Sequence, residues 1–392
     1  MEKMMLKKQA TGRIRSGYPL LVKGDFVKEP KVAEGTLVEL IDSQQKFVAH
    51  GYLATQNKGD GWVLSILPNQ PINQKFYEGL FHEAEANRAA LKADDETTAY
   101  RFFNGEGDGL GGLTIDYYAD YYVFSWYSVG IYQHQKMILE AFKKAVPSRK
   151  GIYQKFRYDT KGATYDSHIF GETAPEPLIV VENGIQYATY LDDGLMTGIF
   201  LDQREVREAI REKYSVGKTI LNTFSYTGAF SVAAAMGGAL ETTSVDLANR
   251  SLPKTQEQFS VNGIDPATQK IIVMDVFDYF KYAARKELSF DTIVVDPPSF
   301  ARSKKKTFSV AKDYSQLLEE VIAITNPNGV IVASTNAANV TMEKFEGMIK
   351  KAFVNQNSQF EWLESYQLPS DFKLNPQFPE GSYLKVWILR KK

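Results

Sequence analysis

The residues best placed to do chemistry in this sequence lie between positions 219 and 246. A short apolar stretch that predicts a strand leads into a polar turn at residues 225–228, and small residues that predict a helix follow. Asp246 ends the next predicted strand, 18 residues beyond Gly228 of the turn (246 − 228). The N–H groups of a helix N-terminus can bind an anion, and an Asp carboxylate can accept both hydroxyls of a ribose. The stretch therefore predicts a nucleoside-binding half of an α/β fold.

Two further acidic residues follow apolar stretches in the same way. Asp275 lies in VMDVF and Asp296 lies in VVDPPSF. Since the carboxyl ends of parallel strands share one edge of a sheet, we expect Asp246, Asp275 and Asp296 to face one crevice. A single acid at a strand end often caps a helix, but three in register favour a ligand site. Asp246 would bind a ribose diol through charged hydrogen bonds of roughly 1.5–3 kcal/mol each, and Asp275 could accept from an adenine amino group.

The glycine content of the turn narrows the choice of ligand. A dinucleotide-binding turn needs three glycines so that its backbone can approach a pyrophosphate. Here Tyr226 stands where an earlier glycine is expected, and only Gly228 remains. A nucleoside that carries an amino acid and no pyrophosphate suits this turn better, which favours S-adenosylmethionine over NAD.

The segment DPPSF, which starts at Asp296, is the second strong signal. Its two prolines fix a rigid bend directly after a predicted strand. Phe300 offers a ring on which a planar base could stack, and Asp296 could accept a hydrogen bond from an exocyclic amine. Simple closure of a loop is the alternative. The residues that we expect to be catalytic are Asp296, Pro297, Pro298 and Phe300.

The elements that position these residues alternate along the second half of the chain. Five strand–helix units in a row predict a parallel sheet with helices on both faces, a Rossmann-like α/β fold. Ligands on such a sheet bind at the carboxyl ends of the strands, where the strand order reverses. The predicted strands are residues 219–224, 241–246, 270–274, 291–296, 329–334 and 383–390, and the predicted helices are residues 229–236, 248–261, 276–284, 312–325 and 341–353.

Two boundaries divide the chain into three predicted domains, at residues 1–72, 73–175 and 176–392. The first domain shows short alternating strands between Gly, Asn and Asp turns, which favour a small β-barrel. The second predicts a middle α/β domain with helices at residues 74–92 and 132–145. Five glycines between residues 105 and 112 could cradle a phosphate, but without a strand-to-helix context they favour a structural turn.

Composition excludes several classes of protein. The hydrophobic share of 44% and the charged share of 24% are those of a soluble globular protein, and no run of about 18 apolar residues could span a membrane. The N-terminus lacks the apolar core of a signal peptide. The chain has no cysteine, which excludes disulfides, thiolate metal sites and a cysteine nucleophile, and its four histidines show no ligand spacing. We expect a cytoplasmic enzyme without a metal.

The basic residues are unevenly distributed, although the net charge of −1 argues against a general polyanion binder. Two groups of them could each hold RNA phosphates on one face of the protein. Solvated surface side chains are the alternative for either group. The first group is Lys7, Lys8, Arg13 and Arg15, and the second is Arg302, Lys304, Lys305 and Lys306.

Several motifs of the chain occur together in one known family. They are RFFNGEGDGLGGLTIDYYAD, TGIFLDQR, LNTFSYTGAFS, SVDLA, DVF, DPPSF and FPEGSYLK. With them the chain resembles the PUA-containing class I methyltransferases of large-subunit ribosomal RNA, whose best-known members make 5-methylcytosine. The resemblance implies a PUA-like barrel, a Rossmann-like class I methyltransferase domain, S-adenosyl-L-methionine as cofactor and 23S ribosomal RNA as partner. It implies these cofactor-binding residues, with Gln203 and Arg204 on the methionine carboxylate: Gln203, Arg204, Phe224, Ser225, Tyr226, Thr227, Gly228, Asp246, Asp275 and Asp296.

One residue of the family pattern is missing. Methylation of cytosine at C5 needs a nucleophile that attacks C6, and the family uses a cysteine thiolate. The corresponding segment here reads TFSVAKDY, with Ala311 near the expected thiol. The run DPPSFARSK also resembles the guanine-N7 methyltransferase module of a related ribosomal RNA enzyme, and a ring nitrogen attacks a methyl group without a covalent adduct. The mechanism favours a ring nitrogen and the family favours C5.

The sequence leaves two other functions open. The missing cysteine would suit a non-catalytic RNA-binding ribosome assembly factor that retains donor binding. A small-molecule or protein acceptor would predict no RNA-dependent activity. If RNA is the substrate, the target base must leave its stack, and the basic residues after DPPSF are placed to hold the flanking phosphates. The sequence is compatible with a homodimer.

Overall fold

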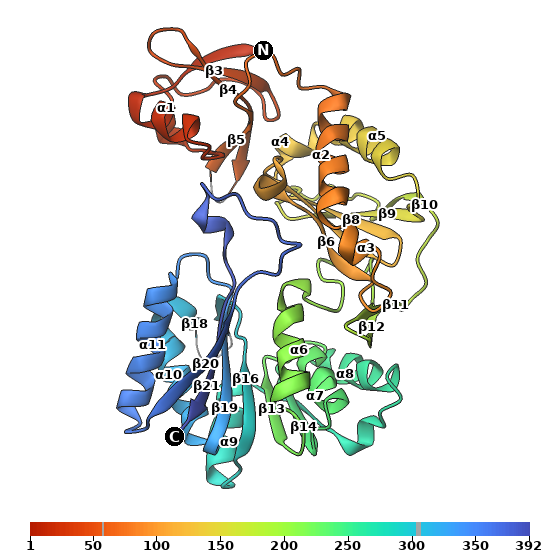
Figure 1. The fold of residues 1–392 in the computed structure, drawn as a ribbon, viewed down its shortest axis with the longest axis vertical. Helices are drawn as coiled ribbons and strands as arrows, with labels where there is room; N and C mark the ends of the chain where they lie inside the picture. The colour runs from red at the N-terminus through yellow and green to blue at the C-terminus, as the bar shows by residue number, and fades with distance from the viewer. Residues whose placement is uncertain (57–58, 303–306) are drawn as a thin grey trace. The chain divides into compact units, whose positions relative to one another are not determined.

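We describe the chain from a computed structural model that covers residues 1–56, 59–302 and 307–392. These residues divide into two compact units. Unit 1 contains Met1–Val180, Thr189–Thr197 and Ser370–Gly381, and unit 2 contains Val181–Ala188, Gly198–Pro369 and Ser382–Lys392 (Figure 1). After it first leaves unit 1, the chain therefore returns to it twice. None of the helices within the covered ranges is long and apolar enough to cross a membrane.

The N-terminal part of unit 1 is a five-stranded sheet in the order β1-β3-β4-β5-β2. The short strands predicted from the segments TLVELID, KFVAHGYL and WVLSIL are present as β3, β4 and β5, but a helix, α1, lies in a region where we expected only strands. Ala10, Thr11 and Ile14 bury one side of α1, and its two turns are too short to give a clear helical period in the sequence. The elements are β1 (Glu2–Met5), α1 (Lys8–Arg15), β2 (Leu20–Leu21), β3 (Leu37–Ile41), β4 (Phe47–Gln56) and β5 (Gly59–Ser65).

The second part of unit 1 is another five-stranded sheet, in the order β10-β9-β8-β7-β6. The predicted helix at residues 74–92 is divided into α2 and α3 at Arg88, and the one at residues 132–145 starts earlier and is divided into α4 and α5. The elements are α2 (Gln74–Asn87), α3 (Ala89–Lys92), β6 (Ala99–Asn104), β7 (Leu113–Tyr118), β8 (Tyr121–Trp126), α4 (Val129–Tyr132), α5 (Gln135–Ala145), β9 (Gly151–Phe156) and β10 (His168–Gly171).

The glycine-rich segment connects the antiparallel strands β6 and β7 through a short 3-10 helix at Gly105–Asp108. A side chain at Gly107 would collide with the main chain of Lys373, and one at Gly111 would collide with the indole of Trp62. Close packing therefore explains these two glycines, and it supports the structural turn over the phosphate cradle.

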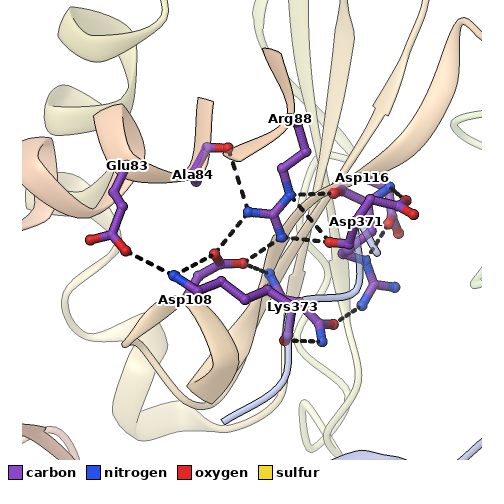
Figure 2. A network of polar contacts seen from close by, with 9 residues as sticks. Glu83, Ala84, Arg88, Asp108, Asp116, Asp371 and Lys373 are labelled. Atoms are coloured by element: carbon purple, nitrogen blue, oxygen red, sulfur yellow. Dashed lines mark hydrogen bonds and ion pairs between the residues drawn. The ribbon is translucent and has the colours of Figure 1, made fainter. Parts of the chain in front are cut away.

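A buried ion pair fixes the segment Ser370–Gly381 within unit 1 (Figure 2). Arg88 donates two parallel hydrogen bonds to the carboxylate of Asp108, at 2.8 and 2.7 Å, and both side chains are almost fully buried. The same guanidinium donates to the main-chain oxygen of Asp371 at 2.5 Å, and the carboxylate of Asp371 accepts from the main-chain N–H of Arg101 at 2.8 Å. This network also explains why the helix breaks at Arg88, whose side chain is held in it.

The described part of unit 2 contains a seven-stranded sheet in the order β15-β14-β13-β16-β19-β21-β20. Strands β15, β14, β13, β16 and β19 pair in parallel, which confirms the predicted α/β sheet, and β21 is antiparallel to both of its neighbours. The strands are β13 (Thr219–Thr223), β14 (Glu241–Asp246), β15 (Lys270–Val273), β16 (Phe290–Val295), β19 (Thr325–Thr335), β20 (Phe360–Tyr366) and β21 (Lys385–Lys391). We did not predict β20, because its two glutamates interrupt the apolar pattern of an edge strand.

Helices cover both faces of this sheet (Figure 1). Residues of α9, α10 and α11 build the core on one face, and residues of α6 and α7 build the core on the other. The strand order reverses between β13 and β16, so the loop after β13 lies at the point where such sheets bind ligands. The helices are α6 (Arg204–Lys213), α7 (Ala229–Met236), α8 (Ser251–Ser260), α9 (Val276–Arg285), α10 (Val310–Ala323) and α11 (Met342–Asn355). Two-stranded sheets comprise β11 (Leu178–Glu182) with β12 (Ile185–Thr189), and β17 (Phe300–Arg302) with β18 (Thr307–Ser309).

Candidate functional site

The loop after β13 has an unusual backbone. Phe224, Tyr226 and Gly228 have φ angles of +54°, +53° and +79°. Such left-handed conformations cost a residue with a side chain roughly 1–2 kcal/mol, and they gather at functional sites. At Gly228 the conformation requires glycine for a second reason, because a Cβ atom there would lie 2.5 Å from Cγ2 of Thr255. The sequence contained no sign that two aromatic residues would adopt this conformation.

Hydrogen bonds fix this loop from several directions. The main-chain N–H of Ser225 donates to the oxygen of Val245 at 3.1 Å, and the hydroxyl of Thr227 donates to the oxygen of Gly198 at 2.6 Å. The N–H of Gly228 closes the turn onto the oxygen of Ser225 at 2.8 Å. Helix α7 begins directly after Gly228, so its first N–H groups face the edge of the sheet that the loop occupies.

Asp246 lies at the carboxyl end of β14 and contacts the same loop. One carboxylate oxygen accepts from the N–H of Tyr226 at 2.9 Å, and the other accepts from the N–H of Ala248 at 2.9 Å. Each carboxylate oxygen can accept a second hydrogen bond. Asp246 is half-buried, so it shapes the loop and still offers acceptors to a ligand.

Asp275, which follows β15, caps helix α9. Its Oδ1 accepts from the N–H groups of Phe277 and Asp278 at 3.0 and 3.4 Å. The helix-cap alternative that we considered for a single strand-end acid therefore applies to Asp275. A capping carboxylate retains its second oxygen, and Asp275 is half-buried at the ligand-binding edge of the sheet.

Asp296 follows β16 and belongs to a buried polar cluster. The side-chain amide of Gln203 donates to Asp296 Oδ2 at 3.2 Å and to the hydroxyl oxygen of Ser334 at 2.9 Å. Burial raises the pKa of Asp296 to about 6, while hydrogen bonds from Ser334 and Gln203 oppose the rise and the charge of Asp202 adds to it. A carboxyl group with a raised pKa at a strand end is typical of a functional site.

The side chain of Gln203 also has a hydrogen-bond acceptor to which no group of the described residues donates. Its Oε1 atom is buried and has no hydrogen-bond partner among the described residues. An unpaired buried oxygen costs roughly 1–3 kcal/mol unless a ligand or water supplies a donor. The ammonium group of a bound amino acid is such a donor, so the site fits the amino-acid part of S-adenosylmethionine.

Two arginines at the start of α6 have different surroundings. Arg207 donates two buried hydrogen bonds of 2.7 Å to Glu182 and a partly buried one of 2.8 Å to the main-chain oxygen of Phe200. Arg207 therefore has a structural role. Arg204 is also buried, and it directly follows Gln203 at the first position of the helix.

The DPPSF segment directly follows β16, the neighbour of β13, at the same edge of the sheet. Pro297 is buried, Pro298 is exposed, and the ring of Phe300 is 62% exposed. The hydroxyl of Ser299 donates to the side-chain oxygen of Asn336 at 2.6 Å, which ties the segment to the loop after β19. A fixed loop that presents an exposed aromatic ring is suited to stacking on a planar base.

Three residues that sequence reasoning missed complete the site: Ser334, Asn336 and Thr255. Ser334 lies near the carboxyl end of β19 and Asn336 directly follows the strand, so the strand-end argument that found Asp296 could have found them too. Thr255 lies in α8 and packs against the turn at Gly228, from which it is distant in the sequence, so no local pattern indicates this contact.

The position expected for a catalytic thiol holds no nucleophile. Ala311 lies in the first turn of α10 and packs against the hydrophobic core. The nearby hydroxyl of Tyr314 is buried and donates to the main-chain oxygen of Ser334 at 2.8 Å. Burial raises the pKa of Tyr314 well above its usual range, so this phenol stays neutral and cannot replace a thiolate.

The basic residues of the N-terminal domain fall into two pairs. Arg13 donates to both oxygens of Asp25, at 2.7 and 2.6 Å, and Arg15 donates to Asp42 at 2.7 Å. Lys7 and Lys8 are exposed, and no carboxylate of the described chain lies within ion-pair distance of either. Among the second group, Arg302 ends strand β17 rather than lying in a loop, and Lys304, Lys305 and Lys306 fall outside the described residues.

Comparison with known proteins connects this geometry with a family. The sequence profile of the S-adenosylmethionine-dependent methyltransferases matches residues 138–374, and that of the PUA-like domain matches residues 4–66. The chain is 52% identical, over the full length of both proteins, to YwbD of Bacillus subtilis, whose name describes a ribosomal RNA large subunit methyltransferase. It is 29% identical to ribosomal RNA large subunit methyltransferase I of Klebsiella pneumoniae, over 97% of each chain.

A solved structure agrees with the sequence comparison. The methyltransferase SMU.776, crystallised with S-adenosylhomocysteine (SAH), covers the whole of both chains with a TM-score of 0.93 and 44% identity. The predicted fold class, family and methyl donor are therefore confirmed. The chain is an enzyme of the S-adenosylmethionine-dependent methyltransferase family, with a PUA-like domain at its N-terminus.

Proposed function

We propose that this enzyme methylates a base of large-subunit (23S) ribosomal RNA. The observation that carries the proposal is the full-length similarity, at 52% identity, to a protein whose name gives that substrate. The N-terminal PUA-like domain supports it, because such an addition is not needed for a small-molecule acceptor. Since ribosomal RNA is the proposed substrate, we also propose that the enzyme acts in the cytoplasm.

We propose that the methyl donor binds at the carboxyl ends of β13, β14 and β16. The loop at residues 224–228 would enclose it, Asp246 would accept from the ribose hydroxyls, and Asp275 would accept from the adenine amino group through its second oxygen. Gln203 and Arg204 would bind the amino-acid part. The unsatisfied Oε1 of Gln203 supports this last assignment, and the strained loop backbone supports the first.

The methyl acceptor is best explained as a ring nitrogen such as guanine N7. S-adenosylmethionine, when bound, supplies an electrophilic methyl group on a sulfonium. A ring-nitrogen lone pair attacks such a group without a protein nucleophile, whereas C5 of cytosine first needs a covalent bond at C6. The chain has no cysteine, and Ala311 packs into the core where a thiol would be required.

The residues around DPPSF would position the flipped base. Phe300 would stack on it, and the bond between Ser299 and Asn336 would hold the segment at a fixed distance from the donor. Asp296 could accept a hydrogen bond from an exocyclic amine of the base. Arg302 and the three lysines at positions 304–306 would contact the flanking phosphates, and Lys7 and Lys8 would contact another part of the RNA.

We propose a separate role for each of the three predicted domains. Residues 1–72 would bind RNA, residues 176–392 would bind the donor and catalyse transfer, and the middle domain at residues 73–175 would connect them. The non-catalytic assembly-factor alternative is less well supported, because the chain is a member of an enzyme family and retains the donor-binding elements.

A methyl-transfer assay tests the proposal. The purified enzyme would be mixed with S-adenosylmethionine labelled in the methyl group and with unmodified 23S ribosomal RNA, and the product nucleosides would be separated by mass spectrometry. We expect label in a ring-nitrogen-methylated base. Label in 5-methylcytosine would overturn the ring-nitrogen assignment, and an absence of label despite measurable donor binding would favour the assembly factor.

A further inference from the structure

A cavity of about 300 Å³ lies in unit 1, whereas the candidate methyltransferase site belongs to unit 2. Helices α4 and α5 form one side of it, and the loop after β9 forms the other. Three tyrosines, Tyr132, Tyr158 and Tyr165, line it together with Lys136 and Lys161. Its volume is at the lower end of the range for small-ligand pockets, roughly 300–1,000 Å³.

The aromatic rings of the cavity hold one another in place. Tyr132 makes edge contacts with Phe156 and Tyr165, with centroids 5.0 and 5.5 Å apart, and Phe156 stacks on Tyr165 at 4.3 Å. Phe156 also contacts Tyr158 at 5.7 Å. These contacts orient the rings before any ligand arrives, so little conformational entropy would be lost on binding.

The rings remain accessible despite these contacts. Tyr165 is 43% exposed, although its ring contacts both Tyr132 and Phe156. The hydroxyls of Tyr158 and Tyr165 have no hydrogen-bond partner in the part of the chain that the structure describes. A ligand could therefore find both an open ring face and free hydroxyls.

The polar residues of the cavity favour an anionic ligand. Lys136 and Lys161 are exposed, and neither has a carboxylate within ion-pair distance among the described residues. Asp159 also lines the cavity, but its Oδ1 already accepts from the main-chain N–H of Lys161 at 2.8 Å. Two unpaired ammonium groups beside aromatic rings are the combination with which proteins bind single-stranded nucleic acids.

We propose that this cavity binds an unstacked base of single-stranded RNA, with Lys136 and Lys161 on the adjacent phosphates. The ring of Tyr165 would stack on the base, and the hydroxyls of Tyr158 and Tyr165 would contact its edge. Bases within a duplex already stack on their neighbours, so the cavity would select unpaired segments. The inference rests on the proposed function in that the RNA would be the ribosomal substrate, and it adds a contact in the middle domain.

Substitutions at Tyr165 test this inference. Binding of a fluorescently labelled single-stranded fragment of 23S ribosomal RNA to the full chain would be measured by anisotropy. Because stacking on one aromatic ring contributes roughly 1–3 kcal/mol per base, Tyr165→Ala should raise the dissociation constant about 5- to 150-fold. Tyr165→Phe, which keeps the ring, should change it less than about threefold.

Matched controls separate the cavity from general RNA binding. Phe170→Ala removes another exposed ring of unit 1, one that Lys143 and Arg149 already cover, and it should leave RNA affinity unchanged. Lys136→Glu should weaken binding and reduce its salt dependence. A fully duplex RNA should bind wild type and Tyr165→Ala equally.

The outcomes distinguish this inference from the proposed function. Equal affinity of wild type and Tyr165→Ala for the single-stranded fragment would overturn the inference, even if methyl transfer to ribosomal RNA is confirmed. Conversely, a loss of affinity specific to Tyr165→Ala would support it even if no methyl group reaches the RNA. An equal loss in Phe170→Ala would also overturn it, because the effect would then not belong to the cavity.

Discussion

Replacing Asp296 by asparagine should make the stability of the protein less dependent on pH. The carboxyl pKa of about 6 lies above its ordinary value of 3.8 because the group is buried. Between these two pH values the folded state binds more protons than the unfolded state, so the free energy of unfolding of the wild type falls as the pH rises. Asparagine has a similar shape and does not titrate.

The size of the effect follows from the shift in pKa. At about 1.36 kcal/mol per pKa unit, the full shift corresponds to roughly 3 kcal/mol of destabilisation by the ionised form. A little less than half of it develops between about pH 5 and about pH 7.5. Asp296 keeps some exposed surface, so solvent screening reduces the figure further. We therefore expect the free energy of unfolding of the asparagine variant to rise by about 1 kcal/mol relative to that of the wild type between the two pH values.

Urea unfolding of both proteins at the two pH values measures this difference. Asparagine also loses hydrogen bonds to Gln203 or Ser334. Because these bonds do not change with pH in the variant, their loss cancels when the free energies of unfolding at the two pH values are compared. If the free energy of unfolding of the variant does not rise relative to that of the wild type, the claim that burial raises the pKa of Asp296 is refuted. A relative loss would mean that ionised Asp296 is stabilised in the folded state and that its pKa is lowered.

Three further substitutions test separate parts of the structure. Gly228→Ala should weaken donor binding at least tenfold in calorimetry, because alanine is strained at this φ and collides with Thr255, and Thr255→Ser, which removes the colliding methyl group, should restore part of the affinity. Asp246→Ala should also weaken donor binding about tenfold or more, equivalent to roughly 1.4 kcal/mol, and an unchanged affinity would remove the ribose assignment. Arg88→Met should destabilise the protein by roughly 3–5 kcal/mol in urea unfolding, since it leaves Asp108 charged and buried, and a cost below about 1 kcal/mol would contradict the role of the ion pair in Figure 2.

The periodic part of the fold could be predicted from the sequence. Strand β14 and helix α7 have the predicted bounds, and the strands that end near Asp246, Asp275 and Asp296 pair as expected. Buried parallel strands and amphipathic helices leave strong local patterns, and the carboxyl ends of such strands must share one edge. The position of the candidate site followed from these two facts.

Features that depend on contacts distant in the sequence could not be predicted. Arg88 and Asp371 are 283 positions apart, yet their contact breaks a predicted helix and fixes a segment of unit 1. The loop that contains the left-handed residues Phe224 and Tyr226 is held by hydrogen bonds to Val245 and Asp246 of β14, which the residue types of the loop do not indicate. The link between Ser299 and Asn336 joins two loops that only the sheet brings together.

The central claim is that this enzyme methylates a ring nitrogen of large-subunit ribosomal RNA, and nucleoside mapping in cells tests it most directly. Ribosomal RNA from a strain without the gene would be digested and compared with wild type by mass spectrometry. The account predicts that one ring-nitrogen-methylated base is lost in the deletion strain and returns with the wild-type gene, but not with a gene that encodes Asp246→Ala. An unchanged set of modified nucleosides, or the loss of a 5-methylcytosine, would contradict it.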